Sequence, residues 1–301
     1  MPLRSFLLLT TLAALWGGSF TFMRYAVPAL GPVPLAFARV ALAAAVLFAI
    51  ALARLPVREI RSRWRDFLVI GILNSALPFS LFCFAEQYVS ASTGAILNAT
   101  SPFFGAIAAA IWLSEPLSLN KVVGMLVGFA GVVILVGGHV DAMSRIVVLA
   151  IAACLVASLC YGLASVYVKR RMQGVSSIAL ACGSQLAAAL VLAPALPFTP
   201  VPGPVTPLVV ANVVALAIGS TAVAYLIYFK LIADIGPSRA LTVTFLIPLF
   251  GVAWGVVFLG EAVTLEMAGG GVLIVAGTAL ALRAGQTRSA AEPSICSRNW
   301  R

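Results

Sequence analysis

SPFFGAIAAAIWLSEPLSL, residues 101–119, returns in altered form as IPLFGVAWGVVFLGEAVTL at residues 247–265. Aligned without a gap, the two stretches share Pro102/Pro248, Phe104/Phe250, Gly105/Gly251, Leu113/Leu259, Glu115/Glu261 and Leu119/Leu265. Each copy is a long apolar run that ends near a single glutamate. A chain that contains such a phrase twice is expected to consist of two related halves.

The similarity extends well beyond the phrase. Residues 92–133 and 238–279 share ten identities over 42 aligned pairs at a constant offset of 146. Near the start of each half, LWGGSFTFMR (15–24) aligns with CYGLASVYVK (160–169), which pairs Trp16 with Tyr161 and Gly17 with Gly162. The repeat therefore covers most of the chain.

Composition indicates that lipid, rather than water, surrounds this chain. Its 301 residues are 62% hydrophobic and 9% charged, and the mean hydropathy is +1.10. A soluble domain has about 25% charged residues, so one aqueous core could not bury this apolar surface. The five cysteines have no metal-ligand spacing, and four lie in apolar runs, which predicts small core residues, no metal site and no cofactor.

Ten stretches are long and apolar enough to cross a bilayer, which takes about 20 helical residues. They are residues 5–26, 33–54, 66–88, 92–113, 120–137, 146–169, 176–196, 207–232, 238–259 and 264–283. The first is predicted to be an uncleaved helix, because a second follows almost at once. The sequence thus predicts an all-α membrane protein with a first repeat in residues 1–140, a second in residues 141–283, and a disordered cytoplasmic tail in residues 284–301.

The basic residues predict the orientation in the membrane. With the N-terminus inside, all but Arg24, Arg39 and Arg145 of the 19 Lys and Arg residues fall in cytoplasmic segments. The net charge of +10 is therefore explained by topology and anionic lipid headgroups, and no nucleic-acid partner is predicted. We expect a multi-pass protein of the inner (plasma) membrane with both termini in the cytoplasm.

Each half has five spans, so the second half enters the bilayer from the opposite side. Inverted repeats of this kind surround a midplane site in secondary transporters, where one half rocks against the other. The chain has no GxxxxGK[ST], HExxH or GxSxG motif, which argues against an ATP motor and against an enzyme. The predicted function is secondary transport of a small molecule by alternating access.

Three motifs carry a family resemblance. LWGGSF (15–20), LAFAR (35–39), and the PFFG and LSEPL elements of the doubled phrase resemble the EamA branch of the drug/metabolite transporter superfamily. The resemblance covers about residues 5–283 and implies ten helices in two inverted repeats and carriage of small metabolites, often by export of amino acids or related compounds. A sugar carrier, a drug or toxic-compound carrier and a non-transporting sensor are the alternatives. In the second half Cys182 aligns with Arg39, so a role for Arg39 would belong to the first half only.

Polar and aromatic side chains near the expected midplane are the predicted substrate contacts. Amides and hydroxyls can hydrogen-bond a solute without the cost of a buried charge, and aromatic rings can cover its apolar part. The predicted substrate-binding residues are Trp16, Arg39, Asn74, Asn98, Thr100, Tyr161 and Tyr225, with Gln185, Thr221 and Thr244 as further candidates. Spans three and eight, and four and nine, should form equivalent walls. The alternative for each residue is a helix–helix hydrogen bond.

Charged residues inside spans are candidates for gates, because each costs about 2.5–3.5 kcal/mol at a helix centre. Arg24, Arg39 and Glu86 lie toward the outer ends of the first three spans and predict an outer ion network; snorkelling or a structural pair is the alternative. By symmetry, Lys169 and Asp234 predict an inner gate, with ordinary interfacial charge as the alternative.

Prolines and glycines predict local distortions of the helices. Pro78, Pro102 and Pro248 are predicted helix breaks near the site, with a packing kink as the alternative. Gly124 and Gly128 predict close packing within the bundle, with a homodimer contact through the fifth and tenth spans as the alternative. The chain is accordingly expected to be a monomer or a homodimer.

The glutamates of the doubled phrase have a structural interpretation. Inversion places Glu115 inside and Glu261 outside, each just before the next helix begins. A carboxylate at a helix N-terminus is favoured by about 0.3–1 kcal/mol. Both are therefore predicted to be interfacial structural residues rather than proton carriers.

Overall fold

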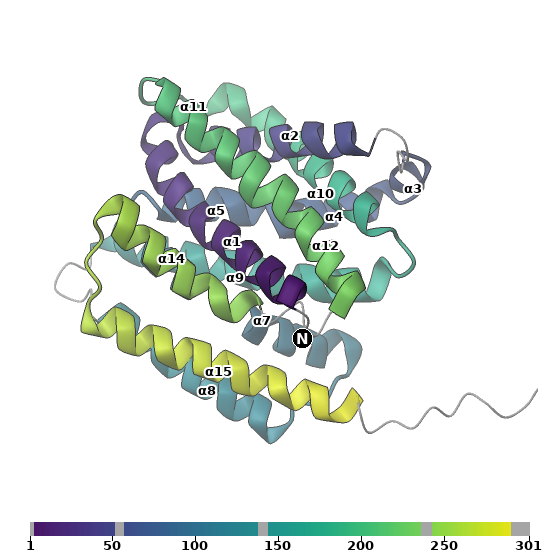
Figure 1. The fold of residues 1–301 in the computed structure, drawn as a ribbon, viewed down its shortest axis with the longest axis vertical. Helices are drawn as coiled ribbons and strands as arrows, with labels where there is room; N and C mark the ends of the chain where they lie inside the picture. Colours follow the sequence, from purple (N-terminus) through teal and green to yellow (C-terminus); the bar gives the residue numbers. More distant parts are fainter. Residues whose placement is uncertain (1–2, 52–56, 138–143, 236–242, 290–301) are drawn as a thin grey trace, which may run out of the picture.

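The computed structural model describes residues 3–51, 57–137, 144–235 and 243–289, and all regular structure within these ranges is helical. The elements are α1 (Leu3–Leu30), α2 (Pro32–Ile50), α3 (Val57–Ser62), α4 (Trp64–Gly71), η2 (Ile72–Ala76), α5 (Leu77–Ala85), α6 (Ala91–Asn98), α7 (Ser101–Leu113), α8 (Leu119–Gly137), α9 (Arg145–Arg171), α10 (Ser177–Leu192), η4 (Ala193–Phe198), α11 (Pro207–Val214), η5 (Ala215–Val223), α12 (Ala224–Ile235), α14 (Val243–Leu259) and α15 (Leu265–Ser289). The predicted all-helical fold is confirmed (Figure 1).

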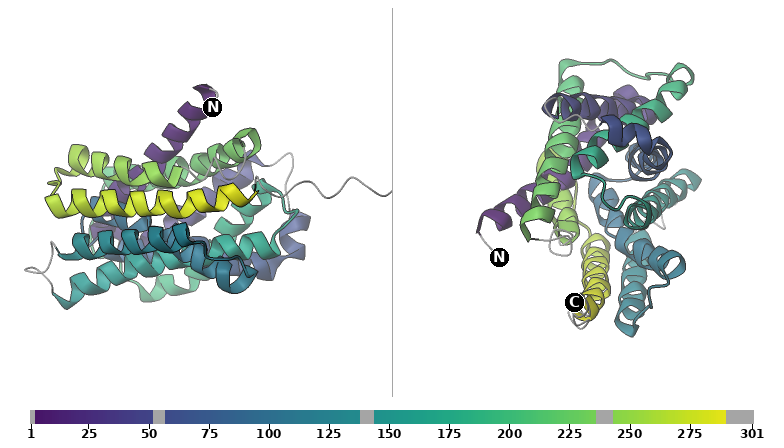
Figure 2. Two further views of the ribbon diagram at one scale, coloured as in Figure 1. Left: turned by 90° about the horizontal axis from the view of Figure 1, so that it is seen from below. Right: turned by 90° about the vertical axis from the view of Figure 1, so that its right-hand side faces the viewer.

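The helices fall on the predicted membrane spans. Within the described ranges, seven helical stretches are long and apolar enough to cross a membrane: Leu3–Leu30, Pro32–Ile50, Trp64–Ala85, Ala91–Leu113, Arg145–Arg171, Ser177–Phe198 and Pro207–Tyr228. Three shorter apolar helices, Leu119–Leu135, Val243–Leu259 and Leu265–Leu280, occupy the remaining predicted spans. The N-terminal end of α1 stands clear of its neighbours (Figure 2).

The first helix of each half packs closely on the fourth span of the other half. A Cβ on Gly17 of α1 would approach the Gly251 nitrogen of α14 to 2.8 Å, so only glycine permits this contact. The same crossing is repeated between α9 and α7, where a Cβ on Gly162 would lie 2.5 Å from the Gly105 nitrogen. The glycines that the repeat conserves internally therefore join the two halves.

The last helices of the two halves, α8 and α15, lie side by side at one edge of the bundle (Figure 1). A Cβ on Gly131 of α8 would lie 2.7 Å from the carbonyl oxygen of Gly270 in α15. The repeat-related pair, Gly124 and Gly277, is equally close. The prediction of small-residue packing within the bundle is confirmed for this helix pair.

Two π-helical segments, η2 and η5, were not foreseen from the sequence. They occupy matching places in the third span of each half, and α5 begins directly after η2 with Pro78 in its first turn. A π-helical segment widens the turn and shifts the side chains after it, and such segments occur often at functional sites. The repeat symmetry thus includes the π-helical segment of the third span, although only the first half has a proline, Pro78, directly after it.

Pro102 and Pro248 occupy equivalent positions but differ in structure. A turn at Ala99 and Thr100 separates α6 from α7, and Pro102 lies in the first turn of α7. Pro248 instead lies inside α14, which is continuous, so the structure contradicts a break at this position. A membrane helix tolerates the lost hydrogen bond when neighbouring helices and side chains support the backbone.

Some predicted boundaries also shift. α15 continues to Ser289, so residues 284–289, predicted as the start of a disordered tail, are helical. The predicted tail from 290 onward, and predicted span residues 52–54 and 238–242, lie outside the described residues.

Candidate functional site

A cavity of about 240 Å³ lies where the two halves meet. Its wall is formed by side chains from α1, α2, α5, α6, α9, α12 and α14, from both π-helical segments, and from the turn and start of α7. Six of the seven predicted substrate-binding residues line it: Trp16, Arg39, Asn74, Asn98, Tyr161 and Tyr225. Thr100 does not; its buried hydroxyl donates to the carbonyl oxygen of Leu97 at 2.7 Å.

The wall is built from equivalent positions of the two halves. The matched pairs are Trp16/Tyr161, Asn74/Ser220, Phe79/Tyr225, Phe82/Tyr228, Asn98/Thr244 and Ser101/Ile247. The expectation that spans three and eight, and four and nine, form equivalent walls is confirmed by this arrangement. The sequence analysis did not name Phe79, Phe82 or Tyr228 as wall residues. The repeat offset of 146 could have found them, because it relates Phe82 to Tyr228 and Phe79 to Tyr225.

Aromatic rings cover much of the cavity. Trp16 contacts Tyr225 edge-on at a centroid separation of 6.4 Å and Tyr228 at 5.4 Å, while Phe82 stacks on Tyr161 at 6.2 Å. Asn74 donates through Nδ2 to the Tyr225 hydroxyl at 2.7 Å, which fixes the phenol at the cavity edge. The site therefore offers a mostly apolar, aromatic surface with a few oriented polar groups.

Of the described residues that line the cavity, Arg39 alone is charged. Its side chain is 4% exposed; Nε donates to Thr221 Oγ1 at 2.9 Å, and the guanidinium carbon lies 3.6 Å from the centre of the Phe79 ring. Nη1 lies 3.6 Å from the Met23 sulfur. Within the described part of the chain, no acidic side chain forms an ion pair with Arg39.

The structure corrects the expected counterpart of Arg39. Gln185, and not Cys182, takes the equivalent place: Gln185 Nε2 donates to Ser75 Oγ at 3.0 Å, as Arg39 Nε donates to Thr221 Oγ1. Ser75 and Thr221 are themselves related by the offset of 146. The loose pattern of the second span hid this relation, since few identities fix its alignment. One half thus carries a cation where the other carries a neutral amide.

At the predicted outer end, Arg24 and Glu86 are in contact but not as an ion pair. Arg24 Nη1 donates to the main-chain carbonyl oxygen of Glu86. The Glu86 carboxylate is fully buried beside Gly94 and Phe20, and neither of its oxygens has a hydrogen-bond partner among the described residues. Arg39 takes no part in this contact, so the predicted network of three charges is reduced to two residues.

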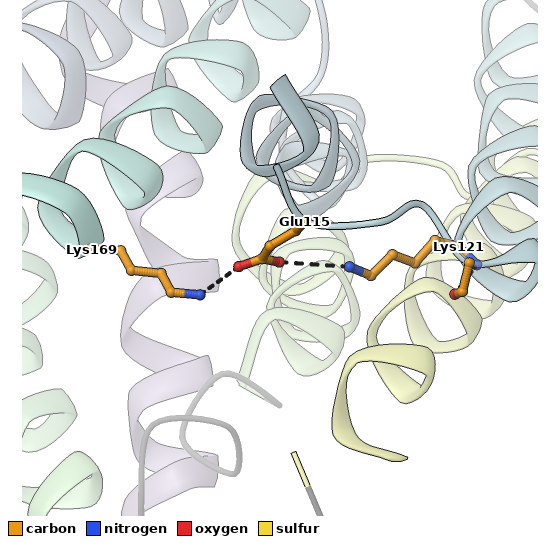
Figure 3. A network of polar contacts seen from close by, with 4 residues as sticks. Glu115, Lys121 and Lys169 are labelled. Carbon is orange, nitrogen blue, oxygen red and sulfur yellow. Dashed lines mark hydrogen bonds and ion pairs between the residues drawn. The ribbon is translucent and has the colours of Figure 1, made fainter. Parts of the chain in front are cut away.

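At the predicted inner end, Lys169 and Asp234 do not contact each other. Lys169 Nζ lies 2.6 Å from Glu115 Oε1, and Lys121 approaches the other carboxylate oxygen to 3.8 Å (Figure 3). Asp234 pairs instead with Lys230, one helical turn away, at 3.0 Å. The hydrogen bond from Lys169 lowers the pKa of Glu115 below its ordinary value. Each charge therefore has a local partner, and the expected cross-pair is not made.

Glu261 caps a helix other than the one expected. Its carboxylate accepts from the backbone N–H groups of Ala91 and Ser92 at 2.7 and 3.0 Å, and from the Ser92 hydroxyl at 2.5 Å. These are the first N–H groups of α6, whereas Glu261 was expected to lie at the N-terminus of α15, the next helix along the chain. Ser90 completes the cap by accepting from the Thr93 N–H at 3.1 Å. Glu261 therefore ties the second half to the fourth span of the first.

The fold and the matched walls agree with the comparison to known families, in which one model matches the chain twice, over residues 3–137 and 148–283. The chain belongs to the EamA-like transporter family. It is thus a multi-pass membrane transporter of the drug/metabolite transporter superfamily, and not a member of an enzyme family. Among the described residues, no group of three His, Cys, Asp or Glu side chains could hold a metal ion.

Several EamA-like relatives are similar over nearly their whole length. The uncharacterized transporter YvbV of Bacillus subtilis is 26% identical, with 97% of this chain and 96% of that protein covered. A probable terminal-alkyne amino-acid exporter of Streptantibioticus cattleyicolor is 27% identical over 92% of this chain and 94% of its own length. A solved crystal structure aligns with a TM-score of 0.67 and 22% identity, covering 94% and 99% of the two chains, which supports the fold alone.

Proposed function

We propose that this EamA-like transporter is a secondary carrier that exports a small organic metabolite of the amino-acid type by alternating access. The observation that carries the proposal is the cavity between the halves: twelve of its 18 wall residues form six pairs that the repeat relates. Inverted halves around one cavity can exchange an outward opening for an inward one. The name of the Streptantibioticus relative, a probable amino-acid exporter, agrees with this solute class.

The proposed orientation has both termini in the cytoplasm of the inner membrane, as the positive-inside rule indicates. The two repeats, residues 1–140 and 141–283, would contribute equivalent helices to the moving bodies, because the first helix of each packs on the fourth span of the other. Their contacts at the ends of the bundle differ: Glu261 holds α6 at the outer end, and Glu115 pairs with Lys169 at the inner end. Arg24 with Glu86, and Lys169 with Glu115, are the contacts we assign to gating.

Transport into proteoliposomes tests the proposal. Purified protein reconstituted in vesicles should accumulate or exchange radiolabelled amino acids, first leucine, phenylalanine and glutamate, with empty vesicles as the baseline. Trp16→Ala and Arg39→Ala should reduce the initial rate at least about tenfold, because each removes a major contact of the cavity wall. Trp64→Ala removes an exposed tryptophan outside the cavity and should leave the rate unchanged.

A growth screen extends the same test to unknown solutes. Cells that express the protein should resist toxic amino-acid analogues or other small acids, and the cavity variants should not. If folded, reconstituted protein moves none of the solutes of the screen, the carrier assignment is wrong.

A further inference from the structure

The charge of the cavity is unusual for a site that binds a zwitterion. Arg39 contributes one positive charge, and among the described residues no Asp, Glu, Lys or His side chain lines the wall besides it. The remaining polar groups of the wall are neutral amides and hydroxyls. A buried charge is stable only when it is paired or well solvated, and the described residues supply Arg39 with no counter-ion.

The Arg39 guanidinium is held in place, but not all of its N–H groups have hydrogen-bond acceptors among the described residues. Its face lies on Phe79, and one edge is fixed by Thr221 through Nε. Nη1 has only the weak acceptor sulfur of Met23, and Nη2 has no hydrogen-bond partner among the described residues. Guanidinium N–H groups form a planar fork that matches two carboxylate oxygens. The arrangement therefore leaves donors for a bidentate anion.

A second unpartnered polar atom lines the same cavity. The Ser220 hydroxyl is buried and has no hydrogen-bond partner in the described part of the structure. Buried polar groups without partners are rare and point to a missing ligand or water. Ser220 lines the cavity from η5, one position before Thr221, whose hydroxyl accepts from Arg39.

We infer that the transported solute is bound through one carboxylate on Arg39, and that its amino group, where present, is not recognised. An α-ammonium group would meet only neutral oxygens and aromatic rings in the described part of this wall, where no carboxylate lies. The solute class is thus small monocarboxylates with an apolar or aromatic body, including keto acids and amino acids alike. This inference rests on the proposed transport function, because it assigns a substrate class to the same cavity.

Direct binding in detergent tests the inference without transport. The probes are two matched pairs, 4-methylpentanoate with 4-methylpentanamide and 3-phenylpropanoate with 3-phenylpropanamide, measured by isothermal titration and by the shift in unfolding temperature. Wild type should bind each acid about 10- to 100-fold more tightly than its amide, the ratio expected for charge-assisted hydrogen bonds. Leucine should bind within about threefold of 4-methylpentanoate, because the ammonium gains no partner.

Variants assign the preference to Arg39. Arg39→Gln should bring the acid-to-amide ratio close to one, and Arg39→Lys should restore part of it, since the charge returns without the fork. Arg65→Gln is the matched control: Arg65 is an exposed arginine whose guanidinium also lies over an aromatic ring, that of Trp64, but it is not part of the cavity wall. It should leave the ratio unchanged.

The inference is overturned if the amides bind as tightly as the acids, if neither acid binds wild type, or if Arg39→Gln keeps the preference. Leucine binding more than tenfold tighter than 4-methylpentanoate would show that the amine is recognised and would refute that part. Failure of the transport proposal gives a different result from failure of the carboxylate inference. In that case the protein still binds acids in preference to amides but moves no solute across a vesicle membrane. Transport of neutral solutes without acid preference would instead retain the carrier and reject the carboxylate site.

Discussion

Glu115 and Glu261 stand at the same place of the repeat and have nearly the same backbone. Each N–H donates to the carbonyl oxygen six residues earlier, Ala109 at 3.3 Å and Gly255 at 3.1 Å. The residue before each glutamate is left-handed, with φ of 53° at Ser114 and 65° at Gly260. Local sequence therefore produces the same helix end twice.

The two side chains nevertheless have different partners. Glu261 accepts from two backbone N–H groups and one hydroxyl at the start of α6, whereas Glu115 is partly exposed and pairs with Lys169. The repeat differs beside the Glu261 carboxylate: a Cβ on Gly255 would lie 2.5 Å from Glu261 Oε2, and the equivalent residue near Glu115 is Ala109. The same helix end therefore forms a tight interhelical clamp at Glu261 and a looser ion pair at Glu115, according to the groups that lie within reach of each carboxylate.

Removing the clamp should have the largest effect. Glu261→Ala leaves two N–H groups of α6 and the Ser92 hydroxyl without their acceptor, and should lower the free energy of unfolding by about 2–3 kcal/mol. Thermal unfolding in detergent measures this loss of stability, with a thiol-reactive dye that reports exposure of buried cysteines. The measurement is made in a Cys296→Ser background, so that the dye reacts with the four buried cysteines alone. Cys83, Cys154, Cys160 and Cys182 are buried free thiols, as predicted, and become reactive on unfolding.

Glu115→Ala is the control for this measurement. An exposed ion pair is worth under about 1 kcal/mol, so its loss should be clearly smaller than that of the clamp. Equal losses at the two positions would contradict the contrast between the two ends.

A methyl group placed beside the clamp should have the second largest effect. In Gly255→Ala the new Cβ would lie 2.5 Å from both Glu261 Oε2 and Ser92 Oγ, so the contact must shift. We expect a loss of about 1–2 kcal/mol, measured by the same assay. Ala109→Gly makes the reverse change at the equivalent site and should cost no more than the helix entropy of glycine, about 0.5–1 kcal/mol.

A double variant tests whether the two changes act on one contact. Gly255→Ala combined with Glu261→Ala should cost less than the two losses added together, because the clamp is already absent. Full additivity would show that Gly255 has another structural role.

The smallest effect is a pH dependence at Glu115. Its pKa is lowered by the hydrogen bond from Lys169, so its contribution to stability is present above the pKa of the unfolded chain and is lost as pH falls through the lower folded value. Glu115→Gln should be less stable than wild type at pH 7 by under about 1 kcal/mol. The difference should shrink as the pH is lowered below about 4.3, the ordinary glutamate pKa. A difference that grows on acidification would refute the assignment.

Much of the site followed from composition and repetition. Trp16, Asn98 and Tyr225 were predicted to line a cavity because they are polar or aromatic residues near the middle of apolar spans, and the structure places them there. Thr100 has the same sequence character, yet its hydroxyl donates to the carbonyl oxygen of Leu97, near the end of α6. Residue type predicts depth in the membrane, but the direction of a side chain depends on the turn of the helix.

Partners across the bundle could not be predicted in the same way. The sequence pairs Lys169 with Asp234 by symmetry, but each lies closer to another charge of opposite sign. The repeat offset of 146 relates Arg39 to Gln185, but only the structure shows their equivalent hydrogen bonds to Thr221 and Ser75. Such contacts are set by helix packing over long separations, about which a local pattern carries no information.

The sequence by itself determined that this chain is a helical membrane protein built from two inverted halves. Hydropathy and an internal repeat depend only on the order of residues along the chain. Only the tertiary structure decided that Arg39 lines a shared cavity with no counter-ion among the described residues, and that Glu261 binds α6 while Glu115 pairs with Lys169. The physical reason is that charges and hydrogen bonds act over a few ångströms in space. Which groups come within that range depends on how closely the glycines allow the helices to approach.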